Sequence, residues 1–139
     1  MPKPFRTSRH VEFHDTDMAG IMHFASFFIY MESAEHEMLR SLGLSVHARL
    51  ENEQVTFPRV AASCDFSSPA RSEDILDIEV AVTRIGQKSV TYEFRFTRGG
   101  DKIATGRMTA VFCRFADGER PVSQPIPADI VEKLKTYAA

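Results

Sequence analysis

The feature that most constrains the fold of this chain is one long amphipathic segment followed by several short alternating ones. From Phe24 to Leu42, apolar side chains recur every three or four residues, the spacing that places them on one face of an α-helix. Gly43 follows this segment and favours a left-handed cap that ends the helix. An apolar stripe of this length must be buried against something broad, and a β-sheet is the natural partner.

The second half of the chain predicts that sheet. Apolar and polar residues alternate as in strands with one buried face, over residues 57–66, 75–85, 89–97 and 103–115. A shorter alternation predicts a first strand over residues 9–13, and a terminal helix is expected over residues 127–137. Short turns between strands imply antiparallel neighbours. The order predicts an α+β fold: a single domain over residues 1–139, with a long central helix packed on a curved antiparallel sheet of about five strands.

The size of the chain favours association with further copies. A domain of 139 residues buries only about two-thirds of the surface that its unfolded chain exposes. We also expect apolar side chains on the second face of the sheet and unprotected strands at its edges, and a second copy would cover both. The sequence therefore predicts a homodimer or a homotetramer.

Charge and cysteine content limit the partners and the compartment. The formal net charge is -2 and the basic residues are scattered, which disfavours nucleic acid as a partner. Cys64 and Cys113 cannot build a disulfide framework, and both lie in apolar alternating segments that predict buried thiols. A reducing compartment fits them, so a cytoplasmic location is expected. No stretch approaches the ~20 apolar residues of a membrane-spanning helix, and membrane insertion is not expected.

The densest group of chemically active side chains, residues 14–24, lies between the predicted first strand and the long helix. A helix N-terminus presents unpaired backbone N–H groups and a partial positive charge, so it can hold an anion or a developing oxyanion. A carboxylate just upstream can fold back across that helix end. The arrangement would place a nucleophile or a base beside an oxyanion hole.

Two parts of this segment resemble the 4-hydroxybenzoyl-CoA thioesterase family of hot-dog proteins, including its Tol-Pal-associated acyl-CoA thioesterase branch. They are Asp-Thr-Asp-Met-Ala-Gly-Ile at residues 15–21 and Ala-Ser-Phe at residues 25–27. Residues 31–40 and 66–74 extend the resemblance over nearly the whole chain. The Asp-x-Asp-x-x-Gly core is fairly specific when it precedes such a helix.

The resemblance implies hydrolysis of an acyl-CoA or aroyl-CoA thioester to free acid and CoA. Asp17 is then the catalytic carboxylate, as nucleophile or general base, and the backbone N–H groups of His23, Phe24 and Ala25 stabilise the oxyanion. In the Tol-Pal branch a histidine directly precedes the Ala-Ser pair, whereas Phe24 stands there in this chain, so the backbone of His23 is the better candidate than its imidazole. Asp15 is expected to be structural. The resemblance implies no cofactor beyond the CoA that the substrate carries.

Other residues are candidates for binding or for an alternative mechanism. Three residues are predicted to contact the substrate: Gly20, Lys88 and Arg71. Lys88 and Arg71, like Arg84 and Arg114, lie near strand ends or turns, and they could hold CoA phosphates or be plain surface charges. Glu35 falls near the centre of the apolar stripe. It is therefore either an alternative catalytic carboxylate or a glutamate bonded to a polar partner at an interface. The spacing of the histidines and acids in residues 14–23 matches no helix-based ligand pair, and no metal site is predicted.

Two other functions remain open at this point. One is a hot-dog dehydratase or hydratase acting on acyl thioesters, which usually shows a His-centred motif that this chain lacks. The other is a non-catalytic protein that binds acyl-CoA.

Overall fold

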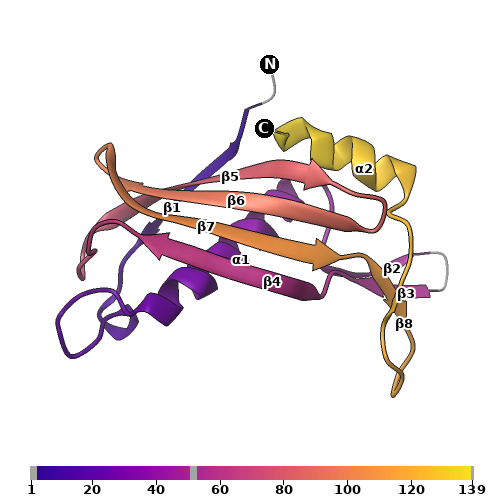
Figure 1. The fold of residues 1–139 in the computed structure, drawn as a ribbon, viewed down its shortest axis with the longest axis horizontal. Coiled ribbons are helices and arrows are strands. Elements are labelled where there is room, and N and C mark those ends of the chain that lie inside the picture. Colours follow the sequence, from indigo (N-terminus) through magenta and orange to yellow (C-terminus); the bar gives the residue numbers. More distant parts are fainter. Residues whose placement is uncertain (1–2, 51–52, 139) are drawn as a thin grey trace.

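The computed structural model describes residues 3–50 and 53–138, and its largest element is an antiparallel sheet with the strand order β1-β5-β6-β7-β4 (Figure 1). The strands are β1 (Phe5–His10), β4 (Arg59–Phe66), β5 (Ile75–Ile85), β6 (Ser89–Arg98) and β7 (Asp101–Val111). Every second side chain of β5 and β6 faces the core, which buries Leu76, Ile78, Val80, Val82, Val90, Tyr92, Phe94 and Phe96. The predicted α+β fold with five strands is confirmed.

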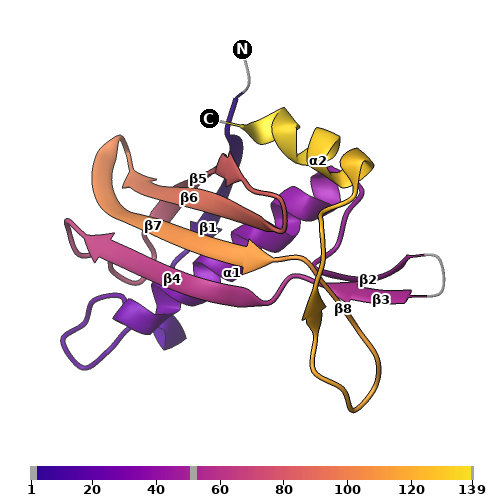
Figure 2. The same cartoon turned by 45° about the vertical axis from the view of Figure 1, so that its right-hand side comes forward.

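The long helix α1 (Phe24–Ser41) lies along one face of this sheet, as both views show (Figures 1 and 2). It begins at the predicted residue and ends at Ser41, with Leu42 as its C-cap and Gly43 in the left-handed conformation at φ +74°. Close packing on the sheet requires a glycine in β7, because a Cβ atom on Gly106 would lie 2.6 Å from Met31 Sδ. The buried face of the helix consists of Phe27, Met31, Ala34, Met38 and Leu39, with Tyr30, Ser26 and Glu35 beside them.

The first strand lies earlier than the predicted residues 9–13. β1 ends at His10, and the chain then turns through the 3-10 helix η1 (Phe13–Asp15). The turn is closed by two bonds: the Asp15 N–H donates to Glu12 O at 2.9 Å, and the Glu12 N–H donates to Asp15 Oδ2 at 3.0 Å. Phe13 is consequently 82% exposed. The prediction was wrong because these local capping bonds outweigh the alternation of two apolar residues.

A second, smaller sheet with the order β2-β3-β8-β9 was not predicted. It contains β2 (His47–Leu50), β3 (Glu53–Thr56), β8 (Cys113–Phe115) and β9 (Val122–Ser123). The predicted strand over residues 103–115 is thereby divided between two sheets. Phe112 interrupts it, because its N–H donates to Lys88 O at 2.8 Å and its buried ring packs against Phe57.

The terminal helix is confirmed. It forms α2 (Ala128–Leu134), with Pro127 at its N-cap, and continues as the 3-10 helix η2 (Lys135–Tyr137). Ile130 and Leu134 anchor it in the core. In the part of the chain that the structure describes, no helix combines the length and the apolar character needed to cross a membrane.

The outer face of β5, β6 and β7 differs from the prediction, because its side chains are mostly polar. It presents Glu79, Thr91, Glu93, Arg95 and Arg107 among others. The edge strand β4, in contrast, is open: six of its eight residues are exposed, Val60 and Phe66 among them. A reason for pairing with a second copy therefore remains at this edge and not on the sheet's outer face.

Only one of the two thiols is fully buried. Cys113 is buried as predicted, whereas Cys64 in β4 is half-buried, and neither forms a disulfide. Burial raises the pKa of the Cys64 thiol to about 11, so this group is protonated at neutral pH.

Candidate active site

The segment that enters α1 is a small hairpin over residues 15–23, named the 15–23 hairpin below. The His23 N–H donates to Asp15 O at 2.8 Å, Thr16 and Met22 form an isolated antiparallel bridge, and the Asp17 N–H donates to Ile21 O at 2.9 Å. The tip turns back through Gly20, whose φ of +79° suits a residue without a side chain. The chain between β1 and α1 thus has a fixed path.

Asp17 lies at the tip of this hairpin with an exposed side chain. Its Oδ1 atom accepts a hydrogen bond from the Ala19 N–H at 2.8 Å, and its carbonyl accepts the Gly20 N–H at 2.9 Å. The first bond orients the carboxylate and leaves Oδ2 without a hydrogen-bond partner among the described residues. Gly20, predicted to contact the substrate, closes the turn that carries Asp17.

The start of α1 offers two backbone donors. Of the three amides predicted to form an oxyanion hole, that of His23 is already bonded to Asp15 O, and the Ser26 amide that follows them donates to His23 O at 2.9 Å. Within the described residues, the amides of Phe24 and Ala25 have no acceptor. Amides in the first turn of a helix point out of its N-terminal end.

A cavity of about 440 Å³ joins the acid to the helix start. Asp17 and Phe24 lie on it together with Phe66 from the end of β4, whose ring packs edge-on against Phe27 with centroids 5.1 Å apart. Its remaining lining residues are Ile21, Met22, Phe27, Ser67, Ser68, Pro69 and Ala70. The result is an apolar, aromatic hollow with one carboxylate at its rim, which suits an apolar acyl group.

Glu35 is brought neither to this cavity nor to the surface. It lies 11 residues beyond Phe24, about 16 Å along the helix, and its side chain is fully buried. It forms an ion pair with Arg59 at the start of β4, and His36 Nε2 lies 3.1 Å from the same guanidinium. Of the two interpretations of Glu35, a glutamate bonded to a polar partner fits this ion pair between α1 and β4; whether the pair lies at an interface between copies stays a prediction.

The predicted cations lie at opposite ends of the molecule. Arg71 is in the loop from β4 to β5, directly after Ala70, which lines the same cavity as Asp17. This loop and the 15–23 hairpin lie at the same end of the molecule (Figure 1). Lys88 is in the turn after β5, an 11-residue strand that spans roughly 35 Å. Within one protomer, Lys88 therefore lies far from Asp17.

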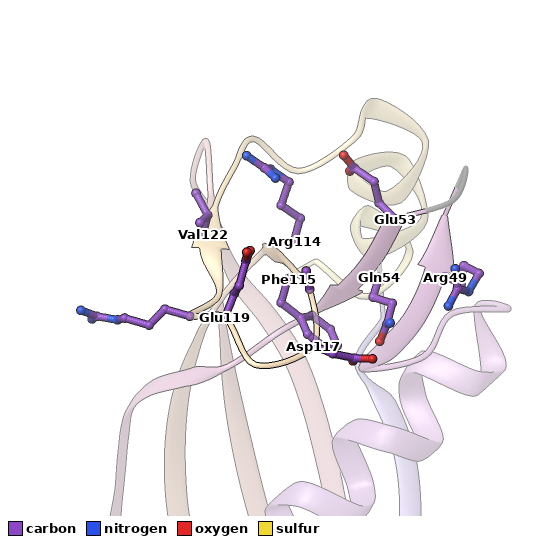
Figure 3. A pocket seen from close by; sticks show the side chains of 10 residues that line it. Arg49, Glu53, Gln54, Arg114, Phe115, Asp117, Glu119 and Val122 are labelled. Atoms are coloured by element: carbon purple, nitrogen blue, oxygen red, sulfur yellow. The ribbon is translucent and has the colours of Figure 1, made fainter.

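A second hollow of about 370 Å³ lies on the small sheet, away from all the predicted catalytic residues. Figure 3 shows its labelled side chains, with Arg49 and Val122 on opposite sides. Three arginines line it, but Glu53, Asp117 and Glu119 offset their charge. We therefore do not regard it as an anion site. In residues 3–50 and 53–138, no three His, Cys, Asp or Glu side chains gather as metal ligands would.

Two contributors to the site were missed at the sequence level. Tyr30 donates to Asp15 Oδ2 at 2.6 Å, a contact across 15 residues that no periodicity reveals. Phe66 is predicted as the end of a strand and the start of the 66–74 segment, and the alternation does not show that this end meets the helix start.

The match to known families decides what kind of protein this is. The family model described as the thioesterase-like superfamily matches residues 11–134, which include β5 to β7, α1 and the 15–23 hairpin. This chain belongs to the thioesterase-like superfamily. The resemblance seen in residues 15–27 is thereby confirmed.

Relatives within the superfamily match over almost their full length. A 1,4-dihydroxy-2-naphthoyl-CoA hydrolase of Nostoc punctiforme is 31% identical over 134 residues, which cover 95% of this chain and 87% of the relative. The acyl-CoA thioester hydrolase YbgC of Escherichia coli is 28% identical over 131 residues, with coverage of 94% and 96%. Among solved structures, a gentisyl-coenzyme A thioesterase is 29% identical, with a TM-score of 0.81 and coverage of 94% and 99%.

Proposed function

We propose that this chain hydrolyses an acyl-CoA or aroyl-CoA thioester to the free acid and CoA, with Asp17 as its catalytic carboxylate. One observation carries the proposal: Asp17 and Phe24, at the start of α1, line the same apolar cavity. A thioester placed there would have a carboxylate on one side and free backbone N–H groups on the other. The relatives named above, whose names describe hydrolysis of CoA thioesters, support the same reaction class.

The chemistry follows from this placement. The Asp17 carboxylate either adds to the thioester carbonyl carbon or takes a proton from a water molecule that adds to it. Negative charge then develops on the carbonyl oxygen, where the amides of Phe24 and Ala25 donate; losing one such donor typically costs about 3–4 kcal/mol of transition-state stabilisation. Collapse breaks the C–S bond and releases the CoA thiolate. In the nucleophilic route, water then hydrolyses the anhydride formed between Asp17 and the acyl group.

Binding is divided between the cavity and the surrounding charges. The phenylalanines at the cavity accept the acyl or aroyl group, and Arg71 lies close enough to that end to attract the charged part of CoA. Lys88 reaches the site only if a second copy supplies it. Pairing at the exposed edge of β4, in a homodimer or a homotetramer, would also cover the exposed side of Asp17. The cytoplasmic location stays a prediction from the two free thiols.

The test is thiol release from a panel of aliphatic and aromatic CoA thioesters, with Asp17→Asn beside the parent. We expect turnover by the parent on at least one substrate and a loss of at least about 100-fold in kcat for the variant, since the carboxylate performs the chemical step. Asp117→Asn is the matched control, because Asp117 is an exposed acid in the loop after β8, away from the cavity.

The same panel separates the alternatives. Full activity of Asp17→Asn would remove Asp17 from the mechanism. Binding of CoA esters without turnover would favour the non-catalytic protein, and loss of 2-enoyl-CoA absorbance without thiol release would favour a hydratase.

A further inference from the structure

Asp15 is a buried acid that the proposed chemistry does not use. Its residue surface is 8% exposed, and its Oδ2 atom accepts hydrogen bonds from Tyr30 Oη at 2.6 Å and from the Glu12 N–H at 3.0 Å. A buried carboxylate is unfavourable unless such bonds compensate for its lost hydration. The buried Asp15 carboxylate lies at the base of the 15–23 hairpin that carries Asp17, so its hydrogen bonds bear on the position of that hairpin.

Tyr30 donates its only hydroxyl hydrogen bond to Asp15 Oδ2. Its Oη atom also lies 3.4 Å from His10 O, but the 2.6 Å contact with Asp15 Oδ2 is the shorter and stronger hydrogen bond. Burial, followed by the bond to Asp15, raises the pKa of Tyr30 well above its ordinary value. The phenol is therefore a donor throughout the neutral range.

The main chain of Asp15 is bonded to the same helix. Its carbonyl oxygen accepts the His23 N–H at 2.8 Å and the Ser26 hydroxyl at 3.0 Å. His23, Ser26 and Tyr30 are the cap, the third and the seventh residues of α1, and this spacing puts them on one side of the helix. One residue thus joins the base of the 15–23 hairpin to three points along the first two turns of α1.

The distance from this base to the reactive group is short. Asp17 follows two residues later, and its N–H is tied to Ile21 O on the other arm of the hairpin. The seating of the hairpin on α1 therefore sets where the Asp17 carboxylate lies relative to the Phe24 and Ala25 amides. A misplacement of about 1 Å between reacting groups can cost roughly 100-fold in rate.

We propose that Asp15 and Tyr30 are a pair of positioning residues that hold the 15–23 hairpin against α1 and so fix the approach of Asp17 to the thioester. The kinetic consequence rests on the proposed function. The structural consequence, a hairpin made rigid by the Asp15–Tyr30 bond, does not depend on it.

The kinetic test compares Tyr30→Phe with Tyr137→Phe. Both changes remove one hydroxyl and keep the ring; Tyr137 Oη bonds Ser41 Oγ at 2.8 Å, at the last residue of α1 and far from the hairpin. For Tyr30→Phe we expect kcat to fall about 10- to 100-fold while KM changes less than about twofold. Because the Tyr137 hydroxyl does not contact the hairpin, Tyr137→Phe should keep both constants.

The structural test is amide hydrogen exchange in the same proteins without substrate. The amides of Asp17 and His23 are bonded within the hairpin, so we expect them to exchange at least about tenfold faster in Tyr30→Phe and at the parent rate in Tyr137→Phe. Unchanged exchange in the hairpin would overturn the inference, as would a kcat that stays within about twofold of the parent or falls equally in both variants. If the hairpin amides exchange faster in Tyr30→Phe but the parent hydrolyses no thioester, the proposed function is wrong, and the Asp15–Tyr30 bond still holds the hairpin against α1.

Discussion

Asp15 and Asp17 are separated by one residue, yet their environments differ. Asp15 is buried and bonded to Glu12 and Tyr30, which supports the expectation that it is structural. Asp17 is exposed at the cavity rim, where a substrate can reach it. The motif alone does not separate the two, because the burial of Asp15 depends on a tyrosine 15 residues away. The catalytic role of Asp17 stays a prediction.

Phe66 should govern the binding of the acyl group. It is half-exposed at the end of β4 and packs against Phe27, so Phe66→Ala removes cavity wall and little core. Losing this apolar contact should raise KM for the best substrate roughly tenfold, with kcat nearly unchanged. Steady-state kinetics measures this directly.

Val122→Ala is the control for Phe66→Ala. Val122 has the same 50% exposure but lies in β9, away from the cavity. Equal effects of both substitutions on KM would show that Phe66 does not contact the acyl group.

Among the helices and strands, those with a long buried face were predicted from the spacing of their apolar residues. The stripe of α1 and the alternation of β5 and β6 gave bounds that the structure reproduces within a residue, because a buried face imposes its period on the sequence. The small sheet escaped prediction because its strands are short and largely polar, as in His47–Leu50. Pairing, and not their own pattern, makes them strands: β2 pairs with the neighbouring β3, and β3 pairs with β8, which lies far along the chain.

The loop from β4 to β5, which forms one wall of the cavity, is fastened by Asp74. Its Oδ2 atom accepts the Arg71 N–H at 2.8 Å and Arg98 Nη1 at 2.9 Å. The bond from the Arg71 amide, with a smaller contribution from Arg98, lowers the pKa of Asp74 below its ordinary 3.8. A lowered folded-state pKa stabilises the fold above the unfolded-state value, and this stabilisation is lost as the pH falls through the folded-state pKa.

Asp74→Asn should therefore destabilise the protein in a pH-dependent way. We expect the free energy of unfolding to drop by about 1 kcal/mol at neutral pH, and the difference from the parent to stay constant down to about pH 5 and to vanish near pH 2. Urea unfolding across this range, with Asp117→Asn as control, measures it. A difference that grows on acidification would contradict the assignment.

At the scale of the whole molecule, the five-stranded sheet ends in an unprotected edge. β4 exposes both its unpaired backbone and the apolar Val60, which is 62% exposed, and such edges pair readily with another chain. The hairpin and the end of β4 lie at the same end of the molecule (Figure 1), and residues of both line the cavity. Association at this edge would enclose the site as well as the edge.

A charge on β4 should then break the assembly. We expect the parent to sediment as a dimer or tetramer, and Val60→Lys to shift it toward the monomer without unfolding it, because the side chain is exposed in the protomer. Val122→Lys is the control, since β9 has only two residues and is too short to pair stably with a strand of another copy. A parent that is monomeric at every concentration tested would refute the expected assembly.

The most direct test of the central claim is a crystal structure of the Asp17→Asn variant bound to the best substrate of the panel. We expect the acyl group in the cavity beside Phe66 and the thioester carbonyl oxygen within hydrogen-bonding distance of the Phe24 or Ala25 N–H. The residue-17 side chain should lie on the other side of the carbonyl carbon. A thioester bound elsewhere, with residue 17 facing only solvent, would contradict it.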